Sequence, residues 1–190
     1  MRCVLFAAVL IAMPAAATVV LDNPRVKVFR TVDQSMAGVD HGPGVVISLM
    51  AGTAVWMDNV LSQPPLGAGG PRVIVQPRRA KTPLPAVPAP GSAPGESAFT
   101  GMSFDTLFEN DQVKVIRARM NVGAREAVHT HGSDTIVVHL SGGEIEDTAN
   151  GKTIVNRWTR GDVEFEARGS SHSARNVGKA VDVVLVALKP

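Results

Sequence analysis

The feature that most constrains the fold is a series of short runs of β-branched and other apolar residues, each ended by Gly, Pro or Asn-Gly. Runs of this length with turn residues between them are typical of strands in sandwiches and barrels. Aromatic residues make up only 4% of the chain, so Val, Ile, Leu and Ala must build the core. We therefore predict an all-β protein with strands at residues 26–29, 45–49, 73–75, 113–116, 135–140, 153–155, 163–165 and 181–188.

Two local patterns refine this prediction. Asn150-Gly151 has the sequence of a type I′ turn and is expected to join residues 144–149 and 152–158 in a hairpin. In the run 162–167, Glu164 and Glu166 alternate with apolar residues, as carboxylates do on the solvated side of a strand. We interpret both as surface residues.

The first residues have the pattern of a targeting segment. Arg2 precedes an apolar run that ends in small residues at Ala17, as in a secretory signal peptide. We expect residues 1–17 to be removed and the mature protein to be secreted or periplasmic. Cys3, the single cysteine, would leave with the peptide, so the mature protein would have neither a disulfide nor a nucleophilic thiol.

A linker divides the mature chain into two related pieces. Residues 81–98 are rich in Pro, Ala, Gly and Ser and are expected to be extended. Before the linker, "LDNPRVKVFR" (21–30) resembles "FENDQVKVIR" (108–117) after it. We interpret residues 18–80 as a degenerate copy of residues 99–190. His41 stands where His131 stands in the second copy, but Val39 replaces His129.

Four of the five histidines lie between residues 129 and 172, all in the second copy. His129 and His131 are one residue apart, so on a strand both imidazoles would point to the same face. The spacing around them extends into two longer patterns. Residues 123–142 run Gly123, five residues, His129-x-His131, three residues, Thr135, six residues, Gly142. Residues 161–176 run Gly161, five residues, Ala167-x-Gly169, two residues, His172, three residues, Asn176.

Both patterns resemble the two signature motifs of the cupin superfamily. The first motif reads Gly-x5-His-x-His-x3-Glu-x6-Gly, and the second reads Gly-x5-Pro-x-Gly-x2-His-x3-Asn. The resemblance implies an RmlC-like jelly-roll β-barrel for residues 99–190, preceded by the truncated copy, as in a degenerate bicupin. It further implies a metal held by His129, His131 and His172, with the motif glycines (Gly123, Gly142, Gly161 and Gly169) and Asn176 in structural roles.

The chain departs from the family pattern at one metal-ligand position. Thr135 stands where the motif has its ligating Glu. Asp134 is the nearest carboxylate and would replace the Glu if a bulge turned it inward. A regular strand would point it the other way, as a hydrogen-bond acceptor behind the metal ligands or as a surface turn residue. His139 shares the face of Thr135, so it either lines the pocket below the metal or is a hydrogen-bonded core residue.

Three imidazoles suit one divalent transition metal per chain (Fe, Zn, Mn, Ni or Cu) and leave positions open for a small molecule. Because the site lacks a carboxylate ligand, we expect that molecule to be anionic. We expect a cupin enzyme of the dioxygenase or isomerase type, or alternatively a cupin that binds a ligand or metal without catalysis. The dispersed charges argue against nucleic-acid binding, the apolar run 4–13 is too short for a stable membrane span, and a homodimer is possible.

Overall fold

The computed structural model describes residues 15–33, 35–62, 69–80 and 98–190. Most of the expected signal peptide and nearly all of the expected linker lie outside these residues. The described part of the chain is all-β, with strands β1 to β13 and no helix, as the sequence predicts. Within it, therefore, nothing has the length and apolar character that a membrane-crossing helix needs.

The first half forms a five-stranded antiparallel sheet in the order β1-β2-β5-β3-β4. Its strands are β1 (Thr18–Asn23), β2 (Val26–Arg30), β3 (Gly44–Ser48), β4 (Ala54–Met57) and β5 (Arg72–Pro77). Every residue of β3 is buried, because both faces of this central strand are covered. We call this unit the N-terminal sheet.

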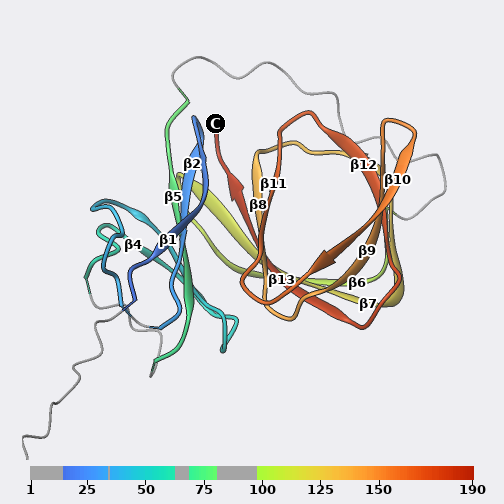
Figure 1. The fold of residues 1–190 in the computed structure, drawn as a ribbon. Helices are drawn as coiled ribbons and strands as arrows, with labels where there is room; N and C mark the ends of the chain where they lie inside the picture. The colour runs from blue at the N-terminus through green and yellow to red at the C-terminus, as the bar shows by residue number, and fades with distance from the viewer. Residues whose placement is uncertain (1–14, 34, 63–68, 81–97) are drawn as a thin grey trace, which may run out of the picture.

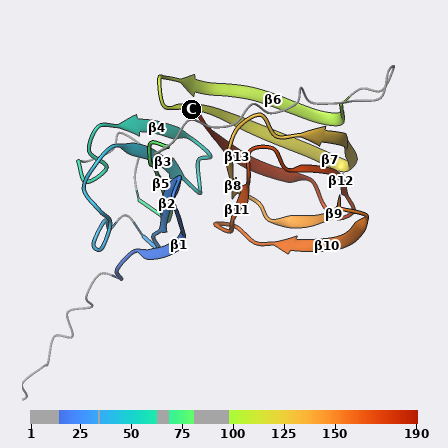
Figure 2. The same cartoon turned by 90° about the horizontal axis from the view of Figure 1, so that it is seen from above.

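The second half forms one eight-stranded sheet that curls into an open barrel (Figures 1 and 2). Its order is β10-β9-β12-β7-β13-β8-β11, with β6 paired to β7. The long strand β7 crosses the barrel, since its first part pairs with β13 and its last part with β12. The strands are β6 (Phe99–Glu109), β7 (Val113–Thr130), β8 (Thr135–His139), β9 (Gly143–Ala149), β10 (Lys152–Trp158), β11 (Val163–Glu166), β12 (Ser171–Asn176) and β13 (Val181–Leu188).

The two halves share a strand arrangement. In the N-terminal sheet β5 lies between β2 and β3, and in the barrel β13 lies between β7 and β8. The turns that open the two halves also match: Asn23 Oδ1 accepts backbone N–H bonds from Arg25 and Val26, and Asn110 Oδ1 accepts them from Gln112 and Val113. These Asx turns explain why the two sequence segments look alike.

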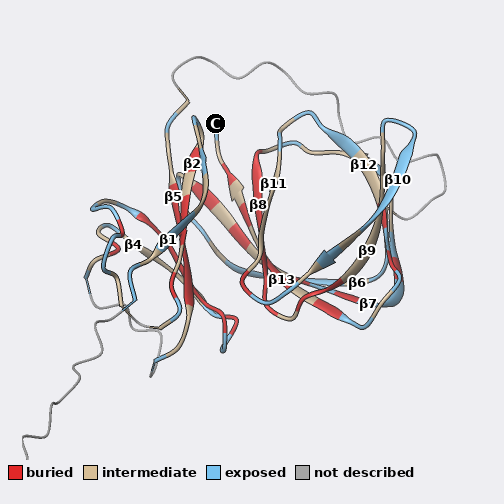
Figure 3. Cartoon of the chain, viewed as in Figure 1, coloured by how far each residue is buried: buried red, intermediate tan, exposed pale blue. Residues whose placement is uncertain are grey.

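The N-terminal sheet packs face to face on one side of the barrel. Figure 3 shows the buried residues of β2 and β5 facing those of β8 and β13. One continuous core joins the two units, and it includes Val26, Val28, Val45, Ile47, Val73 and Val75 from the sheet and Val113, Val115, Ile136, Val138, Val184 and Val186 from the barrel. The apolar face of the barrel is therefore covered by the same chain.

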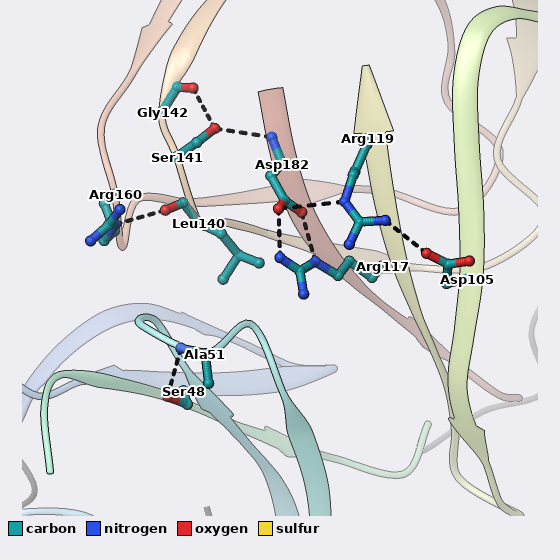
Figure 4. A network of polar contacts seen from close by, with 10 residues as sticks. All are labelled: Ser48, Ala51, Asp105, Arg117, Arg119, Leu140, Ser141, Gly142, Arg160 and Asp182. Carbon is teal, nitrogen blue, oxygen red and sulfur yellow. Dashed lines mark hydrogen bonds and ion pairs between the residues drawn. The ribbon is translucent and has the colours of Figure 1, made fainter. Parts of the chain in front are cut away.

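Polar contacts surround this core. Figure 4 shows Asp182 of β13 between two arginines of β7: Arg117 binds it through two bonds of 2.9 and 2.6 Å, and Arg119 lies 3.7 Å away. The turn after β3 approaches this cluster closely. At Gly52 the backbone has φ +65°, where L residues are strained, and a Cβ there would lie 2.8 Å from the Arg117 guanidinium carbon, so a larger residue would also displace that side chain.

Candidate metal centre

Strands β7 and β12 bring the three motif histidines together. His172 is the cross-strand partner of His129, and His131 follows two residues later on the same face. Ring centroids are 4.7 Å apart for His129 and His172 and 4.9 Å apart for the two pairs that involve His131. One nitrogen from each ring lies within 4.8 Å of the others, an arrangement that could hold a metal ion.

Hydrogen bonds orient two of these rings. The Nδ1 of His129 lies 2.9 Å from the Ala127 carbonyl oxygen, and the Nδ1 of His172 lies 2.9 Å from Asp147 Oδ1. A partner that accepts from Nδ1 leaves Nε2 as the free, metal-binding nitrogen. In agreement, the Nε2 of His172 is buried without a hydrogen-bond partner among the described residues. A buried orphan nitrogen is costly, and a metal would satisfy it.

Metal binding also requires neutral imidazoles. Burial, aided by the neighbouring His172 and His129, lowers the pKa of His131 to about 4. This ring is therefore neutral at physiological pH, and the donor set fits a divalent transition metal.

Thr135, at the position of the motif Glu, and Asp134, one residue before it, have different surroundings. Thr135 lines the cavity beside the histidines but offers only a hydroxyl, which donates to the Ser133 carbonyl oxygen at 3.4 Å. Asp134 is 7% exposed. Its carboxylate binds Arg25 Nε at 2.8 Å and the Arg168 backbone N–H at 2.9 Å. These contacts hold the Asp134 carboxylate at the interface with the N-terminal sheet.

The remaining motif positions support the backbone. Gly123, Gly142, Gly161 and Gly169 all have φ between +70° and +86°, a region in which L residues are strained. Asn176 is buried, and its side-chain amide donates to the carbonyl oxygens of Met120, Asn121 and Lys179. In the first copy, Val39 is buried in the core and His41 is exposed, so neither residue forms a comparable site.

Comparisons with known proteins bear on this architecture. No protein-family model and no curated protein matches the chain. A cupin domain from Bordetella pertussis Tohama I is 23% identical, with a TM-score of 0.45 over 47% of this chain and 95% of that chain. An RmlC-like cupin from Shewanella frigidimarina is 20% identical, with a TM-score of 0.40 over 47% and 78%. A predicted oxalate decarboxylase from Thermotoga maritima is 24% identical, with a TM-score of 0.41 over 53% and 93%.

The two motif patterns lie on neighbouring strands of the barrel. The first motif spans β7 and β8, the second spans β11 and β12, and their three histidines converge on one cavity in the barrel. Residues 99–190 therefore carry both motif patterns on one open β-barrel, which is the arrangement that the resemblance to cupins implies.

Carboxylates that we predicted to be solvated, or did not consider, line the cavity of the barrel. Glu164 and Glu166 point inward with Glu126 and Asp147. The interpretation of Glu164 and Glu166 as solvated residues is wrong, because the N-terminal sheet covers the opposite, apolar face of β11. Burial raises the pKa of Glu166 to about 8, with further increases from the other carboxylates. Burial likewise raises the pKa of Glu126 and of Glu164.

We did not predict Glu126 as a site residue, because the regular alternation of side chains along a strand puts it on the opposite face from His129. In the structure His172 pairs with His129 and Ala174 pairs with Glu126, so three steps on β7 match two on β12. This β-bulge shifts the phase of β7 and turns Glu126 toward the histidines. No spacing rule would have found the bulge.

Below the histidines the cavity is apolar. Its volume is about 340 Å³, and its walls include Met120, Val137, Val183 and Leu185. His139 lies in this wall, as one of the two sequence interpretations predicts, and its ring stacks on Trp158 at 4.7 Å. Burial lowers its pKa to about 4. Both of its ring nitrogens are buried without a hydrogen-bond partner among the described residues.

Proposed function

We propose that the cupin domain binds one divalent transition metal through His129, His131 and His172. The observation that carries the proposal is the convergence of three half-buried imidazoles, of which His172 presents an Nε2 with no hydrogen-bond partner among the described residues. The Ala127 carbonyl and Asp147 support it, since contacts to the other ring nitrogen are typical of metal-binding histidines. Fe, Zn, Mn, Ni and Cu all accept such ligands.

The cavity supports a small-molecule ligand as the second partner. Its volume, about 340 Å³, lies at the lower end of the range of ligand sites. A ligand bound at the metal would extend its body along the apolar wall and offer a polar group to the orphan nitrogens of His139. Four carboxylates already line the cavity and would repel further negative charge there. An anionic ligand would therefore place its charged group at the metal and a neutral part along the rest of the cavity.

Glu166 favours an enzyme over a passive binding protein. Glu166 lines the cavity 3.5 Å from His131, and burial raises its pKa, so its carboxyl is placed to exchange a proton with a molecule bound there. A bound metal would supply Lewis acidity, or a site for dioxygen if it is iron. We therefore place dioxygenase or isomerase chemistry ahead of ligand binding without turnover.

Metal analysis of the purified full-length protein tests the proposal. We expect about one transition metal per chain, and a large loss of metal in His129→Ala, His131→Ala and His172→Ala. His41→Ala is the matched control, since this histidine is exposed and lies in the other half of the chain. Unchanged metal content in all three site variants would refute the proposal.

The shared strand order supports a second proposal, that residues 18–80 derive from a duplicated cupin domain. The N-terminal sheet corresponds to the five barrel strands β6-β7-β13-β8-β11. Among the residues that the structure describes, this half has no counterpart of β9, β10 and β12, and β12 is the strand that carries His172. A chain built in this way would retain one metal site from two copies.

A further inference from the structure

The candidate metal centre lacks the carboxylate ligand that its motif prescribes, yet four carboxylates line the same cavity. Asp147 already bonds a histidine, and Glu166 lies near the ring of His131. Asp147 accepts from His172 Nδ1, and Glu166 Oε2 lies 3.5 Å from His131 Nδ1. Among the described residues, Glu164 forms no ion pair with a histidine.

Glu126 differs from Asp147 and Glu164 because it lies near the free nitrogen of a histidine ring whose other nitrogen is already bonded. Its Oε2 lies 3.7 Å from the Nε2 of His172, the nitrogen that remains free once Asp147 occupies Nδ1. Two atoms that bind one metal at about 2.1 Å each are roughly 3.0–3.4 Å apart. The observed separation is therefore only slightly longer than the separation of two ligand atoms on the same ion.

The backbone holds Glu126 in this position. The bulge between Glu126 and His129 places both side chains on the inner face of β7, where regular alternation would separate them. The cross-strand partner of Glu126 is Ala174, whose small side chain leaves the carboxylate room to turn toward the histidines. The side chain of Glu126 is only 18% exposed, so few orientations are open to it.

We propose that Glu126 is the fourth protein ligand of the metal and supplies from β7 the carboxylate that Thr135 cannot. The inference rests on the proposed metal site and adds a ligand to it. The resulting set of three imidazoles and one carboxylate leaves a net charge of one positive unit on a divalent metal. It also leaves the Thr135 side of the ion open to a small molecule, since Thr135 lines the cavity there.

Metal affinity of the full-length protein tests this inference. Zn²⁺ and Co²⁺ would be titrated in competition with a chromophoric chelator, for the native protein, Glu126→Gln and Glu164→Gln. We expect Glu126→Gln to bind on the order of 100-fold more weakly, since even the residues behind metal ligands contribute about 10–100-fold. Glu164→Gln removes the same charge from the same cavity and should change the affinity less than about threefold. The visible spectrum of bound Co²⁺ should change in Glu126→Gln only.

A ligand exchange makes the test specific. Thr135→Glu restores the carboxylate of the motif, so in the Glu126→Gln background it should recover most of the lost affinity. Recovery would also show that the Glu126→Gln protein is folded. Equal losses in Glu126→Gln and Glu164→Gln, or no loss in either, would overturn the assignment of Glu126 while leaving the three-histidine site intact. Failure of the proposed function looks different, because the native protein would then bind no more metal than His129→Ala.

Discussion

Replacing Asp134 by alanine should destabilise the protein without affecting metal binding. The Asp134 carboxylate binds Arg25, whose side chain comes from the N-terminal sheet and is 13% exposed. The Arg25 guanidinium also donates to the carbonyl oxygens of Arg78 and Lys189, so it is held in place from three sides. Asp134→Ala would leave this cation at the interface without its counter-charge.

The expected loss of stability in Asp134→Ala follows from the burial of the Arg25–Asp134 ion pair. Removing one partner of a buried ion pair costs about 3–5 kcal/mol, because the other charge stays desolvated. Both side chains here keep some contact with water, at 13% and 9% exposure, so we expect the lower end, about 3 kcal/mol. In a chain of this size 1 kcal/mol shifts Tm by about 2–4 °C, so Tm should fall by about 6–12 °C.

Thermal and urea denaturation followed by circular dichroism would measure the effect. A matched control is the exposed pair Arg157–Glu144, with 72% and 46% exposure, where Glu144→Ala should cost no more than about 1 kcal/mol. The double variant Arg25→Met/Asp134→Ala should recover part of the loss, since no unpaired charge remains. If Asp134→Ala were as mild as Glu144→Ala, or if it lost metal, our account of this pair would be refuted.

Three further predictions concern other parts of the molecule. The pKa of Glu166 is raised to about 8 when folded, so the folded state retains a proton that the unfolded chain releases near pH 4.5. Stability of the metal-free protein should therefore fall as pH rises between these values, and denaturation midpoints of Glu166→Gln should show a flatter dependence. Residues 99–190 expressed alone should aggregate or melt well below the full chain, because the apolar face carrying Val113 and Ile136 is uncovered; a soluble monomer of unchanged Tm would contradict this. Mass spectrometry of protein from the producing cell should give a mature N-terminus near Thr18, and an intact Met1 would contradict secretion.

Much of the fold could be predicted from the sequence, because the strands that form the core consist largely of β-branched residues. Every predicted run lies in or overlaps a strand, and the hairpin at Asn150-Gly151 joins β9 to β10. Strands without such runs were missed. β6 is an edge strand whose residues are largely exposed, so burial imposed no pattern on its sequence.

The site was predictable where spacing defines it and unpredictable where it depends on neighbouring units. Motif intervals placed His129, His131 and His172 together. Alternation along β11 showed two faces, but only the N-terminal sheet decides that the apolar face is covered and that Glu164 and Glu166 point into the cavity. Glu126 depended on a local bulge, which has no signal in a single sequence.

Strands β8 and β11 separate the cavity from the core with a single layer of backbone. On β11, Glu164 and Glu166 face the cavity while Val163 and Phe165 pack against the core. Shifting this strand by one residue would exchange the two sets, burying two carboxylates among valines and filling the cavity with apolar side chains. The turn before β11, closed by Thr159 and Asp162, sets the register of this strand. A one-residue insertion or deletion at this turn would thus be more damaging than most substitutions nearby. The length of the turn determines which side chains of β11 face the cavity.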